Sequence, residues 1–270
     1  MEKEKTCAIV AARAAGALIR AIYATEYTVD YKSQDSPVTV ADRDANRKIH
    51  EILQDAFPAY GWLSEETADS PARLSCQRVW VVDPMDGTKE FIQKIPEFAV
   101  SIALIEEGRP VLGVVYNPLQ DRLFWAVRGQ GAWCEEQRLR VSRTERLAEA
   151  TILSSRSETK RGEWADLASF FRPRPTGSAA YKLAFIASGE ADATFTLVPK
   201  NEWDICAGTL LVEEAGGTVT HLNGQPLIFN QPQTLLQGLV ASNGLLHAQL
   251  LDFIARRQGK RPPARPREGV

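Results

Sequence analysis

The spacing of apolar residues in the N-terminal part of the chain predicts two helices. Residues 4–26 form an alanine-rich stretch interrupted by Arg13 and Arg20, as expected for an amphipathic helix with one face toward a core. Residues 43–57 carry large apolar side chains at helical spacing. We place Pro37 in a loop between these helices, because proline is disfavoured in a helix interior.

Short apolar runs typical of β-strands follow these helices. The run from Val79 to Asp83 is rich in β-branched residues and is ended by Pro84, which predicts a buried strand that leads into a turn. Turn residues at 107–110 and 117–118 separate the next apolar runs. We therefore predict an antiparallel meander with strands at 98–105, 111–116 and 123–127.

The second half of the chain alternates between strand-like and helix-like segments. We predict helices at 162–171, 179–188, 204–215 and 244–256, and strands at 151–154, 191–197, 218–221 and 238–241. Gly216 and Gly217 provide a stop for the third of these helices. The pattern predicts a layered α/β fold class with an α+β domain over residues 1–145, an α/β domain over 146–258 and a mobile basic tail over 259–270.

Composition argues against several classes of protein. The 270 residues include 32 Lys and Arg and 34 Asp and Glu, a net charge of −2, which gives no electrostatic support for binding a nucleic-acid polymer. The four cysteines are dispersed without metal-ligand spacing, as is typical of free thiols in a reducing compartment. No uncharged apolar run approaches the roughly 20 residues of a membrane span. We therefore expect a soluble, cytoplasmic protein without a membrane partner.

The segment at 83–88, with the sequence DPMDGT, carries the clearest chemical signal. A strand delivers one carboxylate, proline forces a turn, and a second carboxylate follows three residues later. Two carboxylates on one turn repel each other unless a cation lies between them, and with a backbone carbonyl they form an oxygen set that suits Mg²⁺. N–H groups around Gly87 and Thr88 would hold an anion beside that metal. The alternative is an ordinary capped turn rich in aspartate.

Other acidic positions favour the metal site over that alternative. Glu65 and Glu66 precede the same strand, and Asp204 follows Trp203 at the start of a predicted helix. Separately, the acidic pair fits a solvated loop, and the aspartate fits an interaction with the helix dipole worth roughly 0.3–1 kcal/mol. Together with the DPMDGT turn, these acids indicate a site for a metal and a phosphate group.

These motifs resemble those of the inositol monophosphatase superfamily, which comprises lithium-sensitive, magnesium-dependent phosphatases. The resemblance rests on DPxDGTxxF at 83–91, the preceding Glu-Glu pair, WDxxAG at 203–208 and AGG at 215–217, in the order and spacing of the family. It extends over roughly residues 5–255. The implied fold is an αβαβα sandwich with the active site between its two halves.

The resemblance also implies roles for individual residues. Two or three Mg²⁺ ions would be held by Glu65, Asp83, the carbonyl of Met85, Asp86 and Asp204. Asp42 matches the family acid that pairs with the motif threonine, here Thr88, to orient and deprotonate the attacking water. Glu65 would also be catalytic, serving one metal directly and another partly through water. A carboxylate acting through a hydroxyl is a sensible proton relay, and no covalent phosphoenzyme is required.

Details of the sequence favour one substrate within the superfamily. KEF at 89–91 and PxNxWD at 199–204 are similar to the CysQ-type 3′(2′),5′-bisphosphate nucleotidases. Inositol monophosphatases usually have a glutamate seven residues before the helix aspartate, where it binds inositol hydroxyls, and this chain has Leu197 there. An aliphatic side chain cannot accept a hydrogen bond, so a polyol substrate would lose a contact.

We therefore expect a phosphatase that removes the 3′-phosphate of 3′-phosphoadenosine 5′-phosphate, a small phosphorylated metabolite, giving AMP and phosphate. An inositol-1-monophosphatase or a broad sugar-phosphate phosphatase acting on fructose 1,6-bisphosphate is the alternative. A catalytically inactive phosphate-binding module is more distant, because every implied ligand is intact.

The substrate-contacting residues implied by the resemblance are Asp86, Gly87, Thr88, Gly177, Ser178, Lys182, Lys200 and Asp204. Lys182 and Lys200 would anchor a second phosphate; alternatively, they are ordinary surface charges. Homodimers are common in such families.

Overall fold

Helix α1 (Glu2–Tyr23) packs a stripe of small residues against α2 (Val40–Ala56) in the computed structural model, which describes residues 1–33 and 36–258. Gly16 allows the closest approach to the sheet, because an added Cβ would lie 2.4 Å from the Tyr116 ring. By length and hydropathy, α1 could also cross a membrane, contrary to the sequence-based expectation. The complete burial of its alanine stripe explains this apolar character by packing within the protein.

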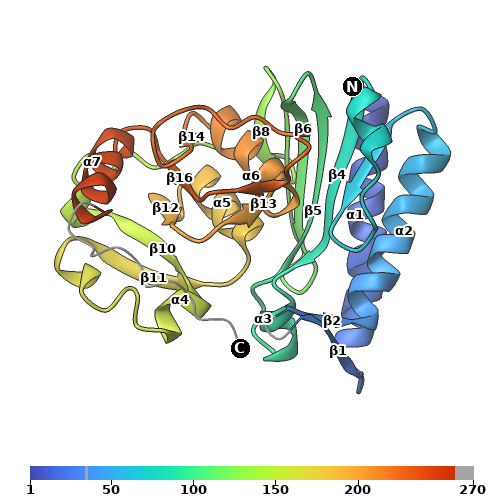
Figure 1. Cartoon of the computed structure of the whole chain (residues 1–270), viewed down its shortest axis with the longest axis horizontal. Helices are drawn as coiled ribbons and strands as arrows, with labels where there is room; N and C mark the ends of the chain where they lie inside the picture. Colours follow the sequence, from blue (N-terminus) through green and yellow to red (C-terminus); the bar gives the residue numbers. More distant parts are fainter. Residues whose placement is uncertain (34–35, 259–270) are drawn as a thin grey trace.

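These two helices cover one face of a seven-stranded sheet (Figure 1). In spatial order its strands are β3 (Gly61–Ser64), β4 (Arg78–Asp86), β5 (Ala99–Glu106), β6 (Arg109–Asn117), β7 (Arg122–Val127), β8 (Gly131–Cys134) and β9 (Gln137–Arg138). β3 runs parallel to β4 and every other pair is antiparallel, so the predicted meander is confirmed. The short strands β3, β8 and β9 were not predicted.

A second, five-stranded sheet uses the later part of the chain. In spatial order its strands are β11 (Arg172–Thr176), β10 (Thr151–Ser155), β12 (Ala193–Thr196), β16 (Leu239–Ser242) and β14 (Thr218–Thr220). β11 was not predicted because it contains Pro173 and Pro175. Its position at the sheet edge accommodates them, since an edge strand can lack ladder donors on its free side.

Helices α5 (Ala179–Ala187) and α6 (Glu202–Glu214) lie between the two sheets and share one core cluster with both (Figure 1). Gly113 of β6 lets α6 approach closely, because an added Cβ would lie 2.7 Å from the Ala207 carbonyl oxygen. Helix α7 (His247–Gln258) covers the outer face of the second sheet. The layers are therefore α, β, α, β and α, as the sequence resemblance implied.

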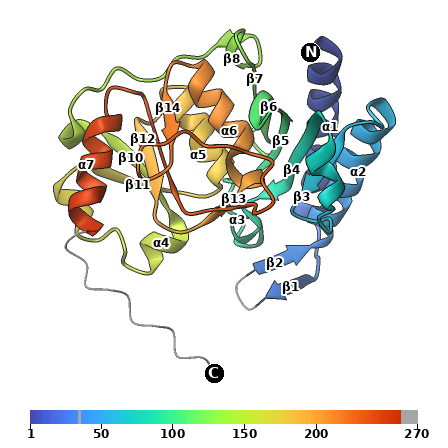
Figure 2. The same ribbon diagram turned by 45° about the horizontal axis from the view of Figure 1, so that its top comes forward.

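Two local predictions were wrong. The segment 162–171 is not an α-helix: it consists of turns and the short 3₁₀ helix Leu167–Ser169, although Trp164 and Phe171 are buried. Gly162 has φ +79°, which breaks a helix there. Pro37 lies in a strand, because β2 (Ser36–Thr39) pairs with β1 (Val29–Ser33) in a hairpin beyond the ends of α1 and α2 (Figure 2).

The remaining elements are α3 (Thr88–Ile92), α4 (Arg156–Lys160), the 3₁₀ helices Pro71–Ser75 and Leu147–Glu149, and the paired short strands β13 (Lys200–Asn201) and β15 (Leu235–Leu236). The seven-stranded sheet ends at Arg138 and the five-stranded sheet begins at Thr151. The division into domains at residue 145 stays a prediction. The tail predicted at 259–270 lies outside the described residues.

Candidate active site

The end of β4 forms the centre of the site. The β4–β5 register runs evenly to Asp83, opposite Ser101, and then shifts so that Asp86 lies opposite Ala99. The extra residue on β4 makes a bulge, which re-aims the chain. Asp83 is buried, and its Oδ1 accepts a hydrogen bond of 2.9 Å from the Met85 N–H. The turn predicted at the end of this strand is therefore held by Asp83 itself.

Two more carboxylates reach Asp83 from different parts of the fold. Glu65 directly follows β3, and its N–H donates to the Val82 carbonyl on β4. Asp204 lies in the first turn of α6 and accepts a hydrogen bond of 3.1 Å from the Asn201 N–H. One carboxylate oxygen from each of Glu65, Asp83 and Asp204 lies within 4.8 Å of the other two. The first sheet and the central helix layer therefore meet at this cluster.

Burial and mutual repulsion perturb these carboxylates. Burial, followed by the negative charge of Glu65, raises the pKa of Asp83 well above its ordinary value. Burial, followed by the charge of Asp86, raises the pKa of Asp204 to about 8, against a smaller opposing effect from Lys200. A cation between the carboxylates would relieve this repulsion. The donors are all hard oxygens, which fit Mg²⁺.

Asp86 is turned toward the start of α5 and is not one of the three converging carboxylates. Its Oδ2 accepts hydrogen bonds of 2.6 Å from the Ser178 hydroxyl and 2.7 Å from the Ala180 N–H. It is still close enough to raise the pKa of both Asp83 and Asp204. The structure thus brings Asp86 beside the cluster while joining it to Ser178, another predicted site residue.

Asp42 and Thr88 form the hydrogen-bonded pair that the sequence predicted. The Thr88 hydroxyl donates to Asp42 Oδ1 over 2.8 Å and also lies 3.3 Å from the Met85 carbonyl oxygen. Asp42 Oδ2 accepts from both the N–H and the hydroxyl of Thr39, each at 2.7 Å. Burial raises the pKa of Asp42 to about 6, although hydrogen bonds from Thr39 and Thr88 lower it. A buried carboxylate aimed at a hydroxyl can accept a proton through it.

A cavity of about 260 Å³ opens beside Asp86. Predicted site residues among its lining are Asp86, Gly87, Gly177, Ser178, Lys182 and Lys200. Lys182 is only 6% exposed and makes no hydrogen bond or ion pair with any described residue. Burial, followed by the charge of Lys200, lowers the pKa of Lys182 to about 8. Lys182 is therefore a cation in the cavity wall, and its surface-charge alternative is wrong.

Gly177 is held in place by Glu97. The Gly177 N–H donates to Glu97 over 2.7 Å, and Arg156 holds the same carboxylate through bonds of 2.6 and 2.7 Å. An added Cβ on Gly177 would lie 2.4 Å from Glu90 Cγ, so only glycine fits there. Gly87 has φ +106°, a conformation that also favours glycine.

Two acidic residues of the cavity carried no sequence signal. Glu158 is buried and accepts hydrogen bonds from Trp164 Nε1 and the Thr196 hydroxyl, and Glu90 lies in the short helix α3. By contrast, Leu197 packs against the apolar cluster under α7, and its neighbour Val198 lines the cavity. The absence of a glutamate at 197 therefore does not leave the cavity without carboxylates that could bind hydroxyls.

Comparison with known proteins supports this description. Residues 1–258 match the model of the inositol monophosphatase family. The chain is 37% identical to an inositol-1-monophosphatase of Mesorhizobium japonicum over 237 residues, which is 84% of this chain and 86% of that protein. It is 39% identical to the Nus factor SuhB of Escherichia coli K12 over 231 residues, covering 80% of this chain and 84% of the relative.

Solved structures agree with the sequence comparisons. An IMPase from Thermotoga maritima superposes with a TM-score of 0.83 at 30% identity, covering 93% of this chain and 96% of that one. CysQ from Bacteroides thetaiotaomicron, described as a bacterial member of the inositol monophosphatase family, gives a TM-score of 0.75 at 30% identity, covering 89% and 97%. The chain therefore belongs to the inositol monophosphatase family, whose members are metal-dependent phosphatases that act on small phosphorylated substrates.

Proposed function

We propose that this chain is a magnesium-dependent phosphomonoesterase that removes the 3′-phosphate of 3′-phosphoadenosine 5′-phosphate. The observation that carries the proposal is the position of the Glu65, Asp83 and Asp204 cluster next to two features. One is the hydrogen-bonded pair of Asp42 and Thr88, and the other is a cavity whose wall contains Lys182, a buried cation with no hydrogen bond or ion pair to a described residue.

Glu65, Asp83, Asp204, the Met85 carbonyl and Asp86 would hold two or three Mg²⁺ ions, with Asp86 exchanging a present hydrogen bond for this role. When bound, magnesium would lower the pKa of a water molecule and neutralise charge on the phosphate group. The protein's own contribution is to hold these groups in place and to exclude bulk water, which reduces the cost of reaching the transition state.

Asp42 and Thr88 would move the proton. The Thr88 hydroxyl donates to Asp42, so it can accept a proton from the attacking water while it passes its own to the carboxylate. Thr39 holds the other oxygen of Asp42 through two hydrogen bonds, which fixes the orientation of the carboxylate. The bond from the water oxygen to phosphorus would form as the P–O3′ bond breaks, and a solvent water would supply the proton that the departing 3′-oxygen takes up. AMP and inorganic phosphate would then separate without a covalent phosphoenzyme.

Lys182 and Lys200 support a substrate with a second anionic group. Lys182 feels the charges of Glu158, Asp86 and Glu90 but makes no hydrogen bond or ion pair with any residue that the structure describes. Burying an ammonium group is costly, and an anionic ligand that binds it would offset that cost. Both lysines line the cavity beside Asp86. The 5′-phosphate of the nucleotide is the anion we assign to them.

We place the enzyme in the cytoplasm, because its four cysteines are all free.

An inositol-1-monophosphatase activity is the second candidate. It is favoured by the name of the relative from Mesorhizobium japonicum and by Glu90 and Glu158, which line the cavity. Carboxylates are good acceptors for the hydroxyl groups of a polyol.

The two candidates are separated by measuring phosphate release from 3′-phosphoadenosine 5′-phosphate and from inositol 1-phosphate, with magnesium and then with lithium added. We expect kcat/KM to favour the nucleotide by about 100-fold or more. A buried polar group such as Lys182 discriminates strongly between a substrate that binds it and one that leaves it without a partner. Equal rates or a preference for inositol 1-phosphate would establish the second candidate. Failure to release phosphate from either substrate would support an inactive phosphate-binding module.

Lys182→Met sharpens this test. We expect it to raise KM for the nucleotide by about tenfold or more, because a charged hydrogen bond is worth roughly 1.5–3 kcal/mol, and to leave KM for inositol 1-phosphate unchanged. Lys89→Met is the matched control, because Lys89 lines the same cavity but is exposed. Equal effects of the two variants on the nucleotide would contradict a specific role for Lys182.

A further inference from the structure

A buried arginine lies outside the proposed reaction centre and joins segments that carry its carboxylates. Arg73, in the 3₁₀ helix Pro71–Ser75, is only 2% exposed. Its guanidinium binds both carboxylate oxygens of Asp69, at 2.7 and 3.0 Å. It also donates to the Asn230 side-chain oxygen over 2.6 Å and to the Gln231 carbonyl over 2.9 Å. Arg73 therefore links the segment after Glu65 to a loop more than 150 residues away.

The same loop holds the start of helix α6. The N–H groups of Asn230 and Gln231 donate to the Glu202 carboxylate at 2.6 and 2.9 Å. Glu202 is fully buried and is the first residue of α6, in the same turn as Asp204. Asn230 has φ +56°, a left-handed conformation. It is maintained by the contact of its side chain with Arg73 and of its N–H with Glu202.

These contacts form a continuous chain from Asp69 through Arg73, the loop at 230–231 and Glu202. One end lies in the segment that begins with Glu65, and the other lies in the helical turn of Asp204. Glu65 and Asp204 repel each other across the proposed metal site and come from different layers of the fold. Something outside the cluster has to hold the two segments together.

We propose that Arg73, Asn230 and Glu202 form a positioning network that sets the separation between Glu65 and Asp204 and thereby the affinity for divalent cations. The proposal rests on the metal site of the proposed function. None of the three side chains is assigned a contact with metal or substrate, so the network acts through the placement of other groups.

The test is isothermal titration of Mg²⁺ into metal-free protein, comparing wild type with Arg73→Met and Asn230→Gly. Asn230→Gly removes only the acceptor for Arg73, because glycine suits the positive φ and keeps the N–H that binds Glu202. We expect the Mg²⁺ dissociation constant to rise about tenfold or more in Arg73→Met and about threefold in Asn230→Gly, as outer contacts typically affect metal affinity. kcat at saturating Mg²⁺ should change less than the dissociation constant.

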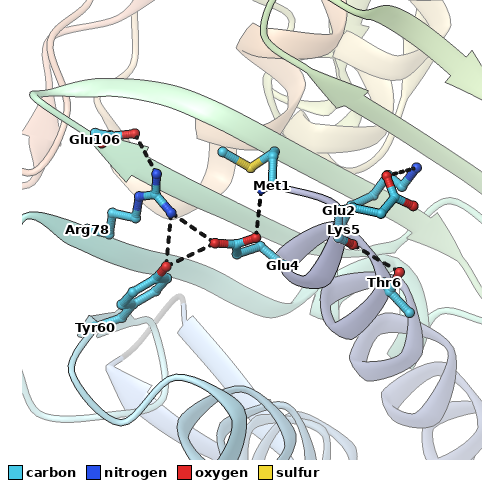
Figure 3. Close-up of polar contacts among 8 residues, drawn as sticks. All are labelled: Met1, Glu2, Glu4, Lys5, Thr6, Tyr60, Arg78 and Glu106. Carbon is cyan, nitrogen blue, oxygen red and sulfur yellow. Dashed lines mark hydrogen bonds and ion pairs between the residues drawn. The ribbon is translucent and has the colours of Figure 1, made fainter.

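Arg78→Met is the matched control. Arg78 lies at the start of β4 and also joins distant segments, since it contacts Glu4, Tyr60 and Glu106 (Figure 3). It should lose thermal stability but keep the wild-type affinity for Mg²⁺. If Arg73→Met does not fold, Asn230→Gly and Glu202→Gln carry the test, since the amide of Gln can replace only one of the two acceptor oxygens.

The outcomes separate the network from the site itself. Wild-type Mg²⁺ affinity in the folded Arg73 and Asn230 variants would overturn the positioning role while leaving the metal site intact. An equal loss of affinity in Arg78→Met would also overturn it, because the effect would then follow general destabilisation. If wild-type protein binds no Mg²⁺, the metal site and the positioning role fall together.

Discussion

The two ends of strand β4 carry charged side chains in contrasting surroundings. At the first residue, Arg78 donates to Glu4 at 2.9 Å, to the Tyr60 hydroxyl at 3.0 Å and to Glu106 at 3.2 Å (Figure 3). Near the last residue, Asp83 accepts one backbone hydrogen bond and faces two other carboxylates. Charge is compensated at the first end and left in excess at the second.

The pKa shifts at the two ends differ in direction. Burial acts to raise the pKa of Glu4, but hydrogen bonds from its own N–H, the terminal amine and Tyr60 lower it below the ordinary value. Burial and the charge of Glu65 raise the pKa of Asp83, with only a backbone hydrogen bond opposing them. Removing one partner from a compensated cluster is destabilising, whereas an uncompensated buried cluster is a candidate site for a ligand.

The largest effect is expected from Asp83→Asn, which removes the most buried acid of the uncompensated end. Turnover should fall by about 10³-fold or more, because several kcal/mol of transition-state stabilisation depend on the metals held there. The metal-free variant should fold and melt at or above the wild-type temperature, since it loses a repelling charge. Phosphate release and differential scanning calorimetry measure the two effects, and near-wild-type turnover would reject the site assignment.

Asp42→Asn tests the proton pathway beside the metal cluster. We expect kcat to fall by about 10²–10⁴-fold while Mg²⁺ affinity is retained, because general-base catalysis supplies an effect of that size. In the wild type, kcat should decline below about pH 6 as Asp42 gains a proton, and the variant should lose this limb of the profile. A large loss of Mg²⁺ affinity in Asp42→Asn would instead make Asp42 a metal ligand.

Arg78→Met tests the compensated end of the strand. It leaves the Glu4 and Glu106 carboxylates without their guanidinium partner, and we expect a loss of about 1–3 kcal/mol in the free energy of unfolding. Chemical denaturation measures this loss. Since the cluster lies at the opposite end of β4 from Asp83, kcat/KM should stay within about twofold of wild type; a large loss of activity in folded protein would break the proposed separation of roles.

The metal-free protein should also show a pH dependence of stability. Asp204 has a pKa of about 8 in the folded state and 3.8 as its ordinary value, so between these pH values the folded state binds a proton that the unfolded chain has released. The free energy of unfolding should therefore fall as pH rises through this window. Melting temperatures in EDTA should decrease by several degrees, and Mg²⁺ should restore more stability at high pH than at low pH. A melting temperature that rises with pH would contradict the proposal that the carboxylate cluster carries uncompensated negative charge.

The sequence predicted those parts of the site that lie in local motifs. Asp83, Thr88 and Asp204 each follow a recognisable change of pattern, and the structure brings Asp83 and Asp204 together and joins Thr88 to Asp42. The alternation of strands and helices likewise predicted the layers. The prediction of a helix at 162–171 was wrong, because buried residues at helical spacing also suit a series of turns.

Residues that act through long-range contacts could not be found in this way. In the sequence, Arg73 is an ordinary arginine in a predicted loop and Glu158 is a lone acid after a predicted strand. In the fold, each contacts partners that are distant in the chain. Lys182 was named as a site residue by the resemblance, but its burial depends on two layers meeting and was not predicted. Tertiary packing, which has no short-range signature, determines all three environments.

The central claim is that the uncompensated end of β4 binds divalent cations, and it is tested most directly by Mn²⁺ binding, followed by electron paramagnetic resonance with Mg²⁺ as competitor. Wild type and Asp42→Asn should both bind Mn²⁺ that Mg²⁺ displaces, and Asp83→Asn should lose most of this binding. Equal Mn²⁺ binding by wild type and Asp83→Asn would contradict the account.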